Sequence, residues 1–223
     1  MDARLRPFGK NAQLARTLAS YRSYWSEYGA SWERLAMIRV RPVAGDRALG
    51  EAFCAAAHDF AAGRPFGAEE LAELRHVKRR VETERVDLAD RGHLDLKLHP
   101  GGIMDIEFLA QVLQVQHLPG QPGCANTPGA LARLRQHDVL TRAEERLLLS
   151  SYEYLRRVEA RLQLVAEHGG GRLPLDEAGL AKAAKRLGWS MHEASDKPEQ
   201  LVADVRERMR AVREVFEARM PGA

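Results

Sequence analysis

The apolar residues of this chain recur every three or four positions along nearly its whole length, and this spacing constrains the fold more than any other feature. The first such stretch steps through Leu14, Leu18, Tyr21, Trp25 and Tyr28, which lie on one face of a helix. From Ile103 the apolar residues fall on more than one side, so we expect that helix to be buried in the middle of a bundle.

Helix boundary signals divide the pattern into separate helices. Ser31, Asp46 and Thr127 are predicted to cap the starts of helices, and Gly188 to end one. Thr141 and Glu144 form a capping box. The helix that they open carries a seven-residue rhythm suited to antiparallel packing, through Leu148, Ser151, Leu155, Val158, Leu162 and Val165.

Two stretches depart from the helical pattern. Leu94, Leu96 and Leu98 alternate with polar residues, which predicts a short extended piece. The sequence GGGRLP, residues 169–174, is predicted to be a flexible connection.

Composition agrees with a helical protein. Aromatic residues make up only 6% of the 223 residues, and Leu and Ala are prominent, which favours helix packing over a sheet. The 34 basic residues, 28 of them Arg, are nearly balanced by 31 acidic ones, and no block of like charge indicates a nucleic-acid partner. The two cysteines are far apart, there is no signal-peptide core, and no apolar run reaches the roughly 20 residues of a membrane helix. We therefore expect a cytoplasmic protein that binds neither nucleic acid nor a membrane.

The opening residues carry the first candidate site. On an extended strand Asp2, Arg4 and Arg6 would share one face, until Pro7 ends the ladder. A carboxylate beside two guanidinium groups suits a metal ion and a phosphate group. Asp2 alone cannot complete a metal site, because such a site needs more than one carboxylate.

Three separated motifs, in order, resemble the glutamine synthetase adenylyltransferase/deadenylylase family (glutamate–ammonia-ligase adenylyltransferase). They are RLRPFG at residues 4–9, WERLAMIRVRPVAGD at residues 32–46 and LKLHPGGIMDIEF at residues 96–108. The resemblance continues through YLRRVEARLQL, RLPLD and VRERMRAVREVFEARM, so that it covers essentially the whole chain. These are large bacterial enzymes with two nucleotidyltransferase halves, each followed by a helical domain, and this chain looks more like the N-terminal, deadenylylating half.

The resemblance implies roles for the opening residues. Asp2 matches the third metal-binding carboxylate of the family, as a catalytic residue, and Arg4 and Arg6 would bind phosphate or anchor the strand. Only Met1 precedes Asp2 in this sequence, so the other two carboxylates are not in it. We therefore expect this polypeptide alone to be inactive and to bind no cofactor, whereas the intact family enzyme would use Mg²⁺ with ATP or ADP.

The segment HPGGIMDIEF holds the second candidate site. Asp105 lies in the first turn of a helix, where a carboxylate is favourable, and Glu107 points to nearly the opposite face, so the two cannot easily chelate one ion. One interpretation is a capped helix start with one buried ion pair, in which a buried acid on the helix face of Glu107 has an Arg partner. In the other, suggested by the resemblance, Lys97, Gly101, Gly102, Asp105 and Glu107 form an interdomain, cleft-shaping or phosphate-approaching turn.

Two further groups of residues are candidates for a site. In SWERLAMIRVR, Trp32 and Leu35 are predicted to face a core, and Glu33, Arg39 and Arg41 to form a solvated or interdomain charge set. The pairs His58-Asp59 and His137-Asp138 resemble the core of a helical metal-dependent phosphohydrolase site, but such a site needs a further His and Asp. Helix-end charge and capping explain the second pair without a metal.

The sequence thus predicts an all-α helical bundle with a short N-terminal strand. Residues 1–12 would be the remnant of a nucleotidyltransferase domain, and residues 13–223 the helical domain. The resemblance implies the helical part of an enzyme that transfers AMP to or from a tyrosine of glutamine synthetase, with glutamine synthetase, a PII signal protein and the nucleotidyltransferase domain as partners. The alternative is a stand-alone helical protein-binding module that has lost the nucleotidyltransferase chemistry.

Overall fold

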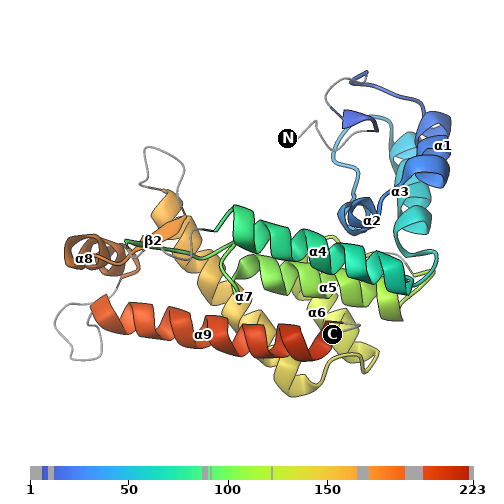
Figure 1. The fold of residues 1–223 in the computed structure, drawn as a ribbon. Helices are drawn as coiled ribbons and strands as arrows, with labels where there is room; N and C mark the ends of the chain where they lie inside the picture. The colour runs from blue at the N-terminus through green and yellow to red at the C-terminus, as the bar shows by residue number, and fades with distance from the viewer. Residues whose placement is uncertain are drawn as a thin grey trace. The chain divides into compact units, whose positions relative to one another are not determined.

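A computed structural model describes residues 7–9, 13–86, 90, 92–121, 123–164, 171–188 and 198–220 of the chain. These residues form nine helices and two short strands, which confirms the all-α prediction (Figure 1). The helices are α1 (Leu18–Tyr28), α2 (Ser31–Met37), α3 (Arg47–Ala62), α4 (Ala68–Glu84), α5 (Ile103–His117), α6 (Thr127–Gln136), α7 (Arg142–Gln163), α8 (Glu177–Arg186) and α9 (Pro198–Arg219). The strands are β1 (His93–Asp95) and β2 (Arg172–Pro174).

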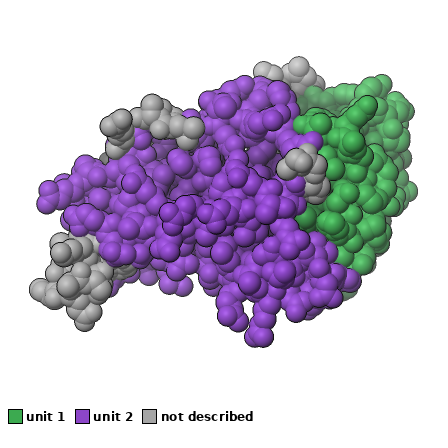
Figure 2. Space-filling view, turned by 60° about the horizontal axis from the view of Figure 1, so that its bottom comes forward, with its two compact units in different colours: residues 1–74, 111–130 green, residues 75–110, 131–223 purple. Residues whose placement is uncertain are grey.

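The predicted N-terminal strand and the boundary at residue 12 lie at residues 1–6 and 10–12, which are outside the described residues. Both stay predictions. The chain divides into two compact units, coloured separately in Figure 2. Unit 1 contains residues 1–74 and 111–130, and unit 2 contains residues 75–110 and 131–223.

Unit 1 is built on α1, α2 and α3, and aromatic rings fill the space between α1 and α3. Trp25 of α1 stacks on Phe60 of α3, with ring centroids 5.1 Å apart. Arg34 of α2 is buried, and it donates to Glu70 at 2.8 Å and to the carbonyl oxygens of Ala61 and Arg64. A buried guanidinium is thus satisfied by a carboxylate and by backbone acceptors at the end of α3.

Unit 2 has its core where α7, α8 and α9 meet the two-stranded sheet. The strands pair antiparallel, with Leu94 opposite Leu173 and both side chains buried. Five positions of the seven-residue rhythm in α7 are buried as predicted, namely Leu148, Ser151, Leu155, Val158 and Leu162. The sixth, Val165, lies outside the described residues.

The sequence located several boundaries correctly. The Asp46 and Thr141 side chains cap α3 and α7, and Glu144 completes the capping box. Gly188 follows α8 with φ +79°, a left-handed conformation that suits glycine. The extended piece predicted around Leu94 is β1.

Other local predictions were wrong. Arg172–Pro174 form strand β2 rather than a flexible connection, because β1 supplies a pairing partner that is remote in sequence. Ser31 is the first residue of α2 rather than its cap. At α6 the Asn126 side chain accepts from the Gly129 N–H at 2.7 Å, one residue before the predicted cap. Trp32 is 39% exposed instead of in the core, whereas Glu33 is buried, where it accepts from the Ala30 N–H and the Tyr24 hydroxyl.

Candidate functional site

The predicted site residues fall into two groups with different outcomes. Asp2, Arg4 and Arg6 lie outside the described residues, so their metal and phosphate roles stay predictions. Lys97, Gly101, Gly102, Asp105 and Glu107 are all described, and they surround the loop between β1 and α5.

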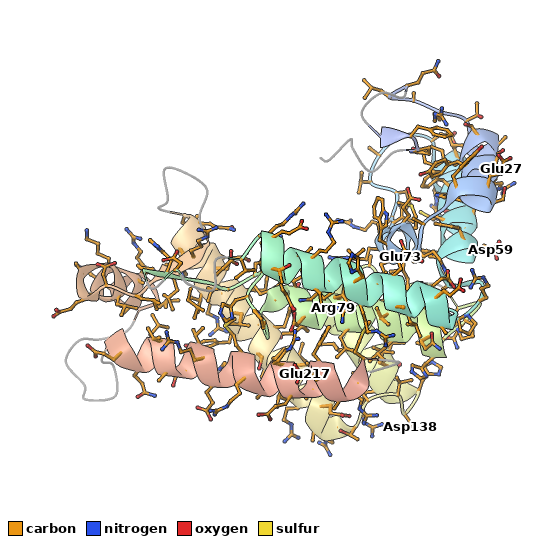
Figure 3. The ribbon with its side chains drawn as sticks, viewed as in Figure 1. Glu27, Asp59, Glu73, Arg79, Asp138 and Glu217 are labelled. Atoms are coloured by element: carbon orange, nitrogen blue, oxygen red, sulfur yellow. The ribbon has the colours of Figure 1, made fainter. Side chains whose placement is uncertain are left out.

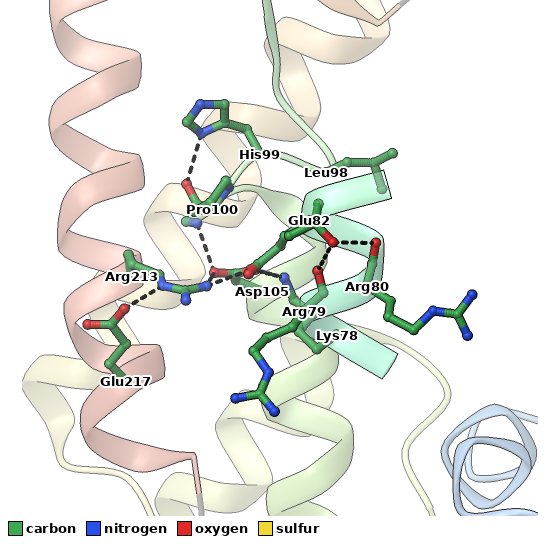
Figure 4. A network of polar contacts seen from close by, with 12 residues as sticks. Lys78, Arg79, Arg80, Glu82, Leu98, His99, Pro100, Asp105, Arg213 and Glu217 are labelled. Atoms are coloured by element: carbon green, nitrogen blue, oxygen red, sulfur yellow. Dashed lines mark hydrogen bonds and ion pairs between the residues drawn. The ribbon is translucent and has the colours of Figure 1, made fainter. Parts of the chain in front are cut away.

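Asp105 is the centre of a buried ionic network in unit 2. Its side chain is fully buried in the first turn of α5. Lys78 Nζ of α4 lies 2.6 Å from Asp105 Oδ1, and Arg213 Nη1 of α9 lies 3.1 Å from Asp105 Oδ2. One carboxylate therefore joins three helices, as Figure 4 shows from close by.

Two glutamates complete this network. Glu82 Oε1 lies 2.5 Å from Lys78 Nζ and 2.6 Å from Arg213 Nη1, and Glu217 Oε1 accepts from Arg213 Nε at 2.7 Å. Burial lowers the pKa of Arg213, but the hydrogen bond to Glu217 and the charges of Asp105 and Glu82 outweigh it, so the pKa is raised overall. Arg213 therefore stays charged, held by three carboxylates.

Gly101 and Gly102 allow the loop to pack tightly beside this network. Gly101 has φ +78°, and a Cβ at that position would lie 1.8 Å from the Met209 carbonyl oxygen of α9. The Gly101 N–H donates to Asp105 Oδ2 at 2.8 Å. No side chain but hydrogen fits at Gly101, because both its conformation and its closeness to α9 exclude a Cβ.

The amides at the start of α5 bind acceptors inside the chain. The Gly102 N–H donates to His99 O, the Ile103 N–H to Leu96 O and the Met104 N–H to Lys97 O, at 2.8 to 3.0 Å. This geometry supports the interpretation as a capped helix start with a buried ion pair. The phosphate-approaching role of the turn stays a prediction, and these hydrogen bonds do not favour it.

Lys97 and Glu107 occupy different surroundings from Asp105. Lys97 is exposed, and its backbone N–H donates to Asp95 Oδ1 at 2.9 Å. Glu107 is half-buried and accepts from the Tyr152 hydroxyl at 3.1 Å. The sequence predicted a buried acid on the helix face of Glu107. The buried acid of this helix is instead Asp105.

Sequence reasoning missed Lys78, Glu82 and Arg213. A signal for the first two was present, because steps of three and four residues from Leu71 and Leu74 lead to positions 78 and 82. Charged residues in the continuation of an apolar stripe point to a buried ion pair. Arg213 gives no comparable signal for its burial, because its partners Glu82 and Asp105 are more than 100 residues away in sequence and only Glu217 is near.

A large cavity lies beside the network. Its volume is about 810 Å³, and Arg213, Glu217, His99 and Pro100 belong to its lining. A smaller cavity of about 170 Å³ is lined by Arg79, Phe216 and Glu217 among others; Figure 3 labels Arg79 on α4 and Glu217 on α9. Arg213 lines both cavities.

The donor set of the described residues does not fit a magnesium site. No cluster of three or more His, Cys, Asp or Glu among them is placed to hold a metal ion. Asp105 faces Lys78 and Arg213, two cations that already compensate its charge.

The His-Asp pairs have structural explanations. Burial lowers the pKa of His58, partly offset by a hydrogen bond with the Val40 backbone. Asp138 follows α6 in a left-handed conformation, and its carboxylate accepts from Arg135 at 2.9 Å. The second pair is thus accounted for by a helix end, and His58 of the first pair is partly buried whereas Asp59 is exposed.

No helix formed by the described residues is long and apolar enough to span a membrane.

Two family models match the chain. Residues 75–220 match the model described as GlnD PII-uridylyltransferase, and residues 1–56 match the model described as glutamate-ammonia ligase adenylyltransferase. The first match covers the whole of the ionic network.

Similar proteins share one description, bifunctional glutamine synthetase adenylyltransferase/adenylyl-removing enzyme. The protein of Brucella melitensis is 33% identical over 195 residues, which are 85% of this chain and 20% of that protein. The protein of Mycobacterium tuberculosis is 37% identical over 166 residues, 74% of this chain and 16% of that protein. The protein of Mycobacterium leprae is 32% identical over 220 residues, 97% of this chain and 22% of that protein. The chain thus spans about a fifth of the length of the curated relatives that it matches.

Proposed function

Because the chain belongs to the family of bifunctional glutamine synthetase adenylyltransferase/adenylyl-removing enzymes, we propose that it forms the helical part of such an enzyme. The observation that carries this proposal is similarity to these enzymes along 74% to 97% of the chain. In the proposed enzyme AMP is transferred from ATP to a tyrosine of glutamine synthetase, or is removed from it by phosphate.

The contribution of this chain to that reaction is positional. Asp105, Lys78 and Arg213 fix α4, α5 and α9 to one another, and the loop at Gly101 is packed against α9. Phosphoryl transfer depends on accurate positioning of groups, so a rigid helical support would help the catalytic domain of the proposed enzyme. We propose that the loop of Lys97, Gly101 and Gly102, with Asp105 and Glu107, shapes the surface on which that domain packs.

The catalytic ions and nucleotides belong to the intact enzyme in this proposal. Asp2 would supply one metal-binding carboxylate, and Arg4 and Arg6 would lie near phosphate. Mg²⁺ with ATP or ADP would be used there, and a PII signal protein and glutamine would set the direction of the reaction. The chain looks more like the N-terminal half of these enzymes, which removes AMP. This polypeptide by itself would not transfer AMP.

An activity assay tests the proposal. The nucleotidyltransferase portion of the Mycobacterium tuberculosis relative is joined in front of this chain, and labelled AMP on glutamine synthetase is followed with Mg²⁺ and ATP or phosphate. We expect the joined polypeptide to add or remove AMP much faster than the nucleotidyltransferase portion alone. Equal rates for the two, or AMP transfer by this chain alone, would contradict the proposal.

A metal-dependence test addresses the N-terminal residues. We expect this polypeptide to show no Mg²⁺-dependent ATP binding in equilibrium dialysis. Binding that requires Mg²⁺ and disappears in Asp2→Asn would show that these residues already form a working metal site.

The alternative is a stand-alone helical module that binds glutamine synthetase or a PII protein without AMP transfer. Its distinguishing result is tight, stoichiometric binding of this chain to one of these proteins, with no gain of activity in the joined polypeptide. An in-frame upstream extension encoding a Gly-Ser turn and an Asp-x-Asp pair would favour the enzyme instead.

A further inference from the structure

The large cavity of unit 2 is rich in arginine. Its volume of about 810 Å³ is in the range of pockets that bind small molecules. Five arginines from α9, from β2 and from the residue after α4 line it, namely Arg85, Arg172, Arg206, Arg210 and Arg213. The proposed support of a catalytic domain makes no use of such a concentration of cations.

Ion pairs account for only part of this positive charge. Arg172 Nε lies 3.5 Å from Asp95 Oδ2, and Arg213 is bound by the carboxylates of the ionic network. Arg85, Arg206 and Arg210 make no ion pair with another residue in the described part of the chain. Three guanidinium groups at one cavity are therefore left for an outside anion.

The arginines of α9 are well placed to act together. Arg206, Arg210 and Arg213 follow one another at intervals of four and three residues, which places them on one face of the helix. Arg213 is already fixed by Glu217, Glu82 and Asp105, so it loses little freedom when it contacts a ligand. Guanidinium groups bind phosphate through paired, charge-assisted hydrogen bonds.

The rest of the lining limits the kind of anion. Val86, Leu94, Leu175 and Met209 give the cavity an apolar wall, of which Val86, Leu94 and Met209 are buried. Four carboxylates also line the cavity and disfavour a highly charged polyanion, namely Asp90, Asp95, Glu214 and Glu217. The lining suits a ligand that has a phosphate at one end and an apolar portion. An N–H or O–H group of the ligand could donate a hydrogen bond to Glu214.

We propose that this cavity binds a small organic phosphate, with the phosphate on Arg206, Arg210 and Arg85 and the apolar portion against Val86 and Met209. The proposal goes beyond the proposed function, because it assigns a role to Arg85, Arg206 and Arg210, which that function does not use. Two kinds of ligand combine a phosphate with an apolar portion in this way: a nucleotide, and a phosphate ester of another aromatic or apolar alcohol.

Calorimetric titration without Mg²⁺ and with a chelator tests the site in the full 223-residue chain. The probes are ADP and phenyl phosphate, with adenosine and phenol as matched compounds that lack phosphate. The double variant Arg206→Gln/Arg210→Gln is compared with Arg142→Gln/Arg146→Gln, which removes two exposed arginines at the same spacing on α7. Circular dichroism confirms that each variant is folded.

We expect at least one phosphate probe to bind, and the cavity variant to weaken it by about tenfold or more, while the α7 variant stays within about twofold. Binding of ADP alone would identify a nucleotide site, and binding of both probes a general phosphate-ester site. Failure of both probes at millimolar concentration, equal binding of adenosine or phenol, or equal loss in the two variants would overturn the proposal. Binding that is unchanged in Asp2→Asn separates this site from the metal-dependent one.

Discussion

Asp105 shows how much one buried carboxylate can determine in a helical protein. Removing it leaves Lys78, which is only 3% exposed, without one of its two carboxylate partners. It also removes the acceptor for the Gly101 N–H. Breaking a buried ion pair from one side costs much more than the pair contributes, because an uncompensated charge stays buried.

We therefore predict that Asp105→Asn lowers the free energy of unfolding by about 3 to 5 kcal/mol. Urea denaturation followed by circular dichroism measures the change. The control is Asp138→Asn, whose side chain is 89% exposed in a conformation that Asn tolerates, and we expect a change below about 0.5 kcal/mol there. Similar losses in both variants would mean that the network does not stabilise unit 2.

Gly101 and Gly188 form a matched pair at the residue scale. Their φ angles are +78° and +79°, but a Cβ at Gly188 would meet no atom within 4 Å, whereas one at Gly101 would meet the α9 backbone. Gly188→Ala should cost about 1 to 2 kcal/mol for conformation alone. We expect Gly101→Ala to cost clearly more, measured by the urea midpoint, and equal costs would argue against close packing of this loop on α9.

At the scale of elements, Glu144 links the start of α7 to the end of α9. It completes the capping box with Thr141, and its carboxylate accepts two hydrogen bonds from Arg219, at 2.5 and 2.8 Å. The hydrogen bonds from Arg219 hold the pKa of Glu144 at about 2, although burial opposes them.

This pKa predicts acid sensitivity. Because the folded-state pKa lies below the usual value of 4.5, the unfolded chain binds more protons between these two values. The stabilisation is complete above about pH 4.5 and is lost as the pH falls towards 2. We expect it to be about 1 to 2 kcal/mol, since Arg219 is 37% exposed and solvent screens the pair.

Glu144→Gln removes the charge at this position but can keep the capping box, because Gln also serves as its third helical residue. The variant therefore separates the effect of the charge from that of the cap. Urea denaturation at several pH values should show a smaller loss of stability on acidification in this variant than in the parent. Glu70, whose pKa is also about 2, titrates in the same range in both proteins, so only their difference is informative. Glu153→Gln, an exposed position of α7, is the control and should keep the parent pH profile.

At the scale of the whole molecule, the described residues are helical apart from one pair of three-residue strands and the connecting loops. We predict a far-ultraviolet circular dichroism spectrum with the double minimum of α-helix and little sheet signal. A spectrum dominated by sheet would contradict both the sequence periodicity and the fold. The similarity to relatives extends across both units.

The sequence by itself determined the helices, because their apolar spacing and caps are local properties of consecutive residues. Asp46, Thr141 and Gly188 show this, as do the buried positions of α7 and the family motifs. Small errors arose at Ser31, which follows the cap residue Ala30, and at Thr127, where the neighbouring Asn126 side chain accepts the capping hydrogen bond.

Only the tertiary structure decided which charges are buried and what they contact. Asp105 meets Arg213 across 108 residues, and β2 exists because β1 lies beside it. Spacing along one helix cannot reveal such partners, since they come from elements that only folding brings together. The arginine-lined cavity has the same origin, because its walls come from α9, from both strands and from the residues that follow α4.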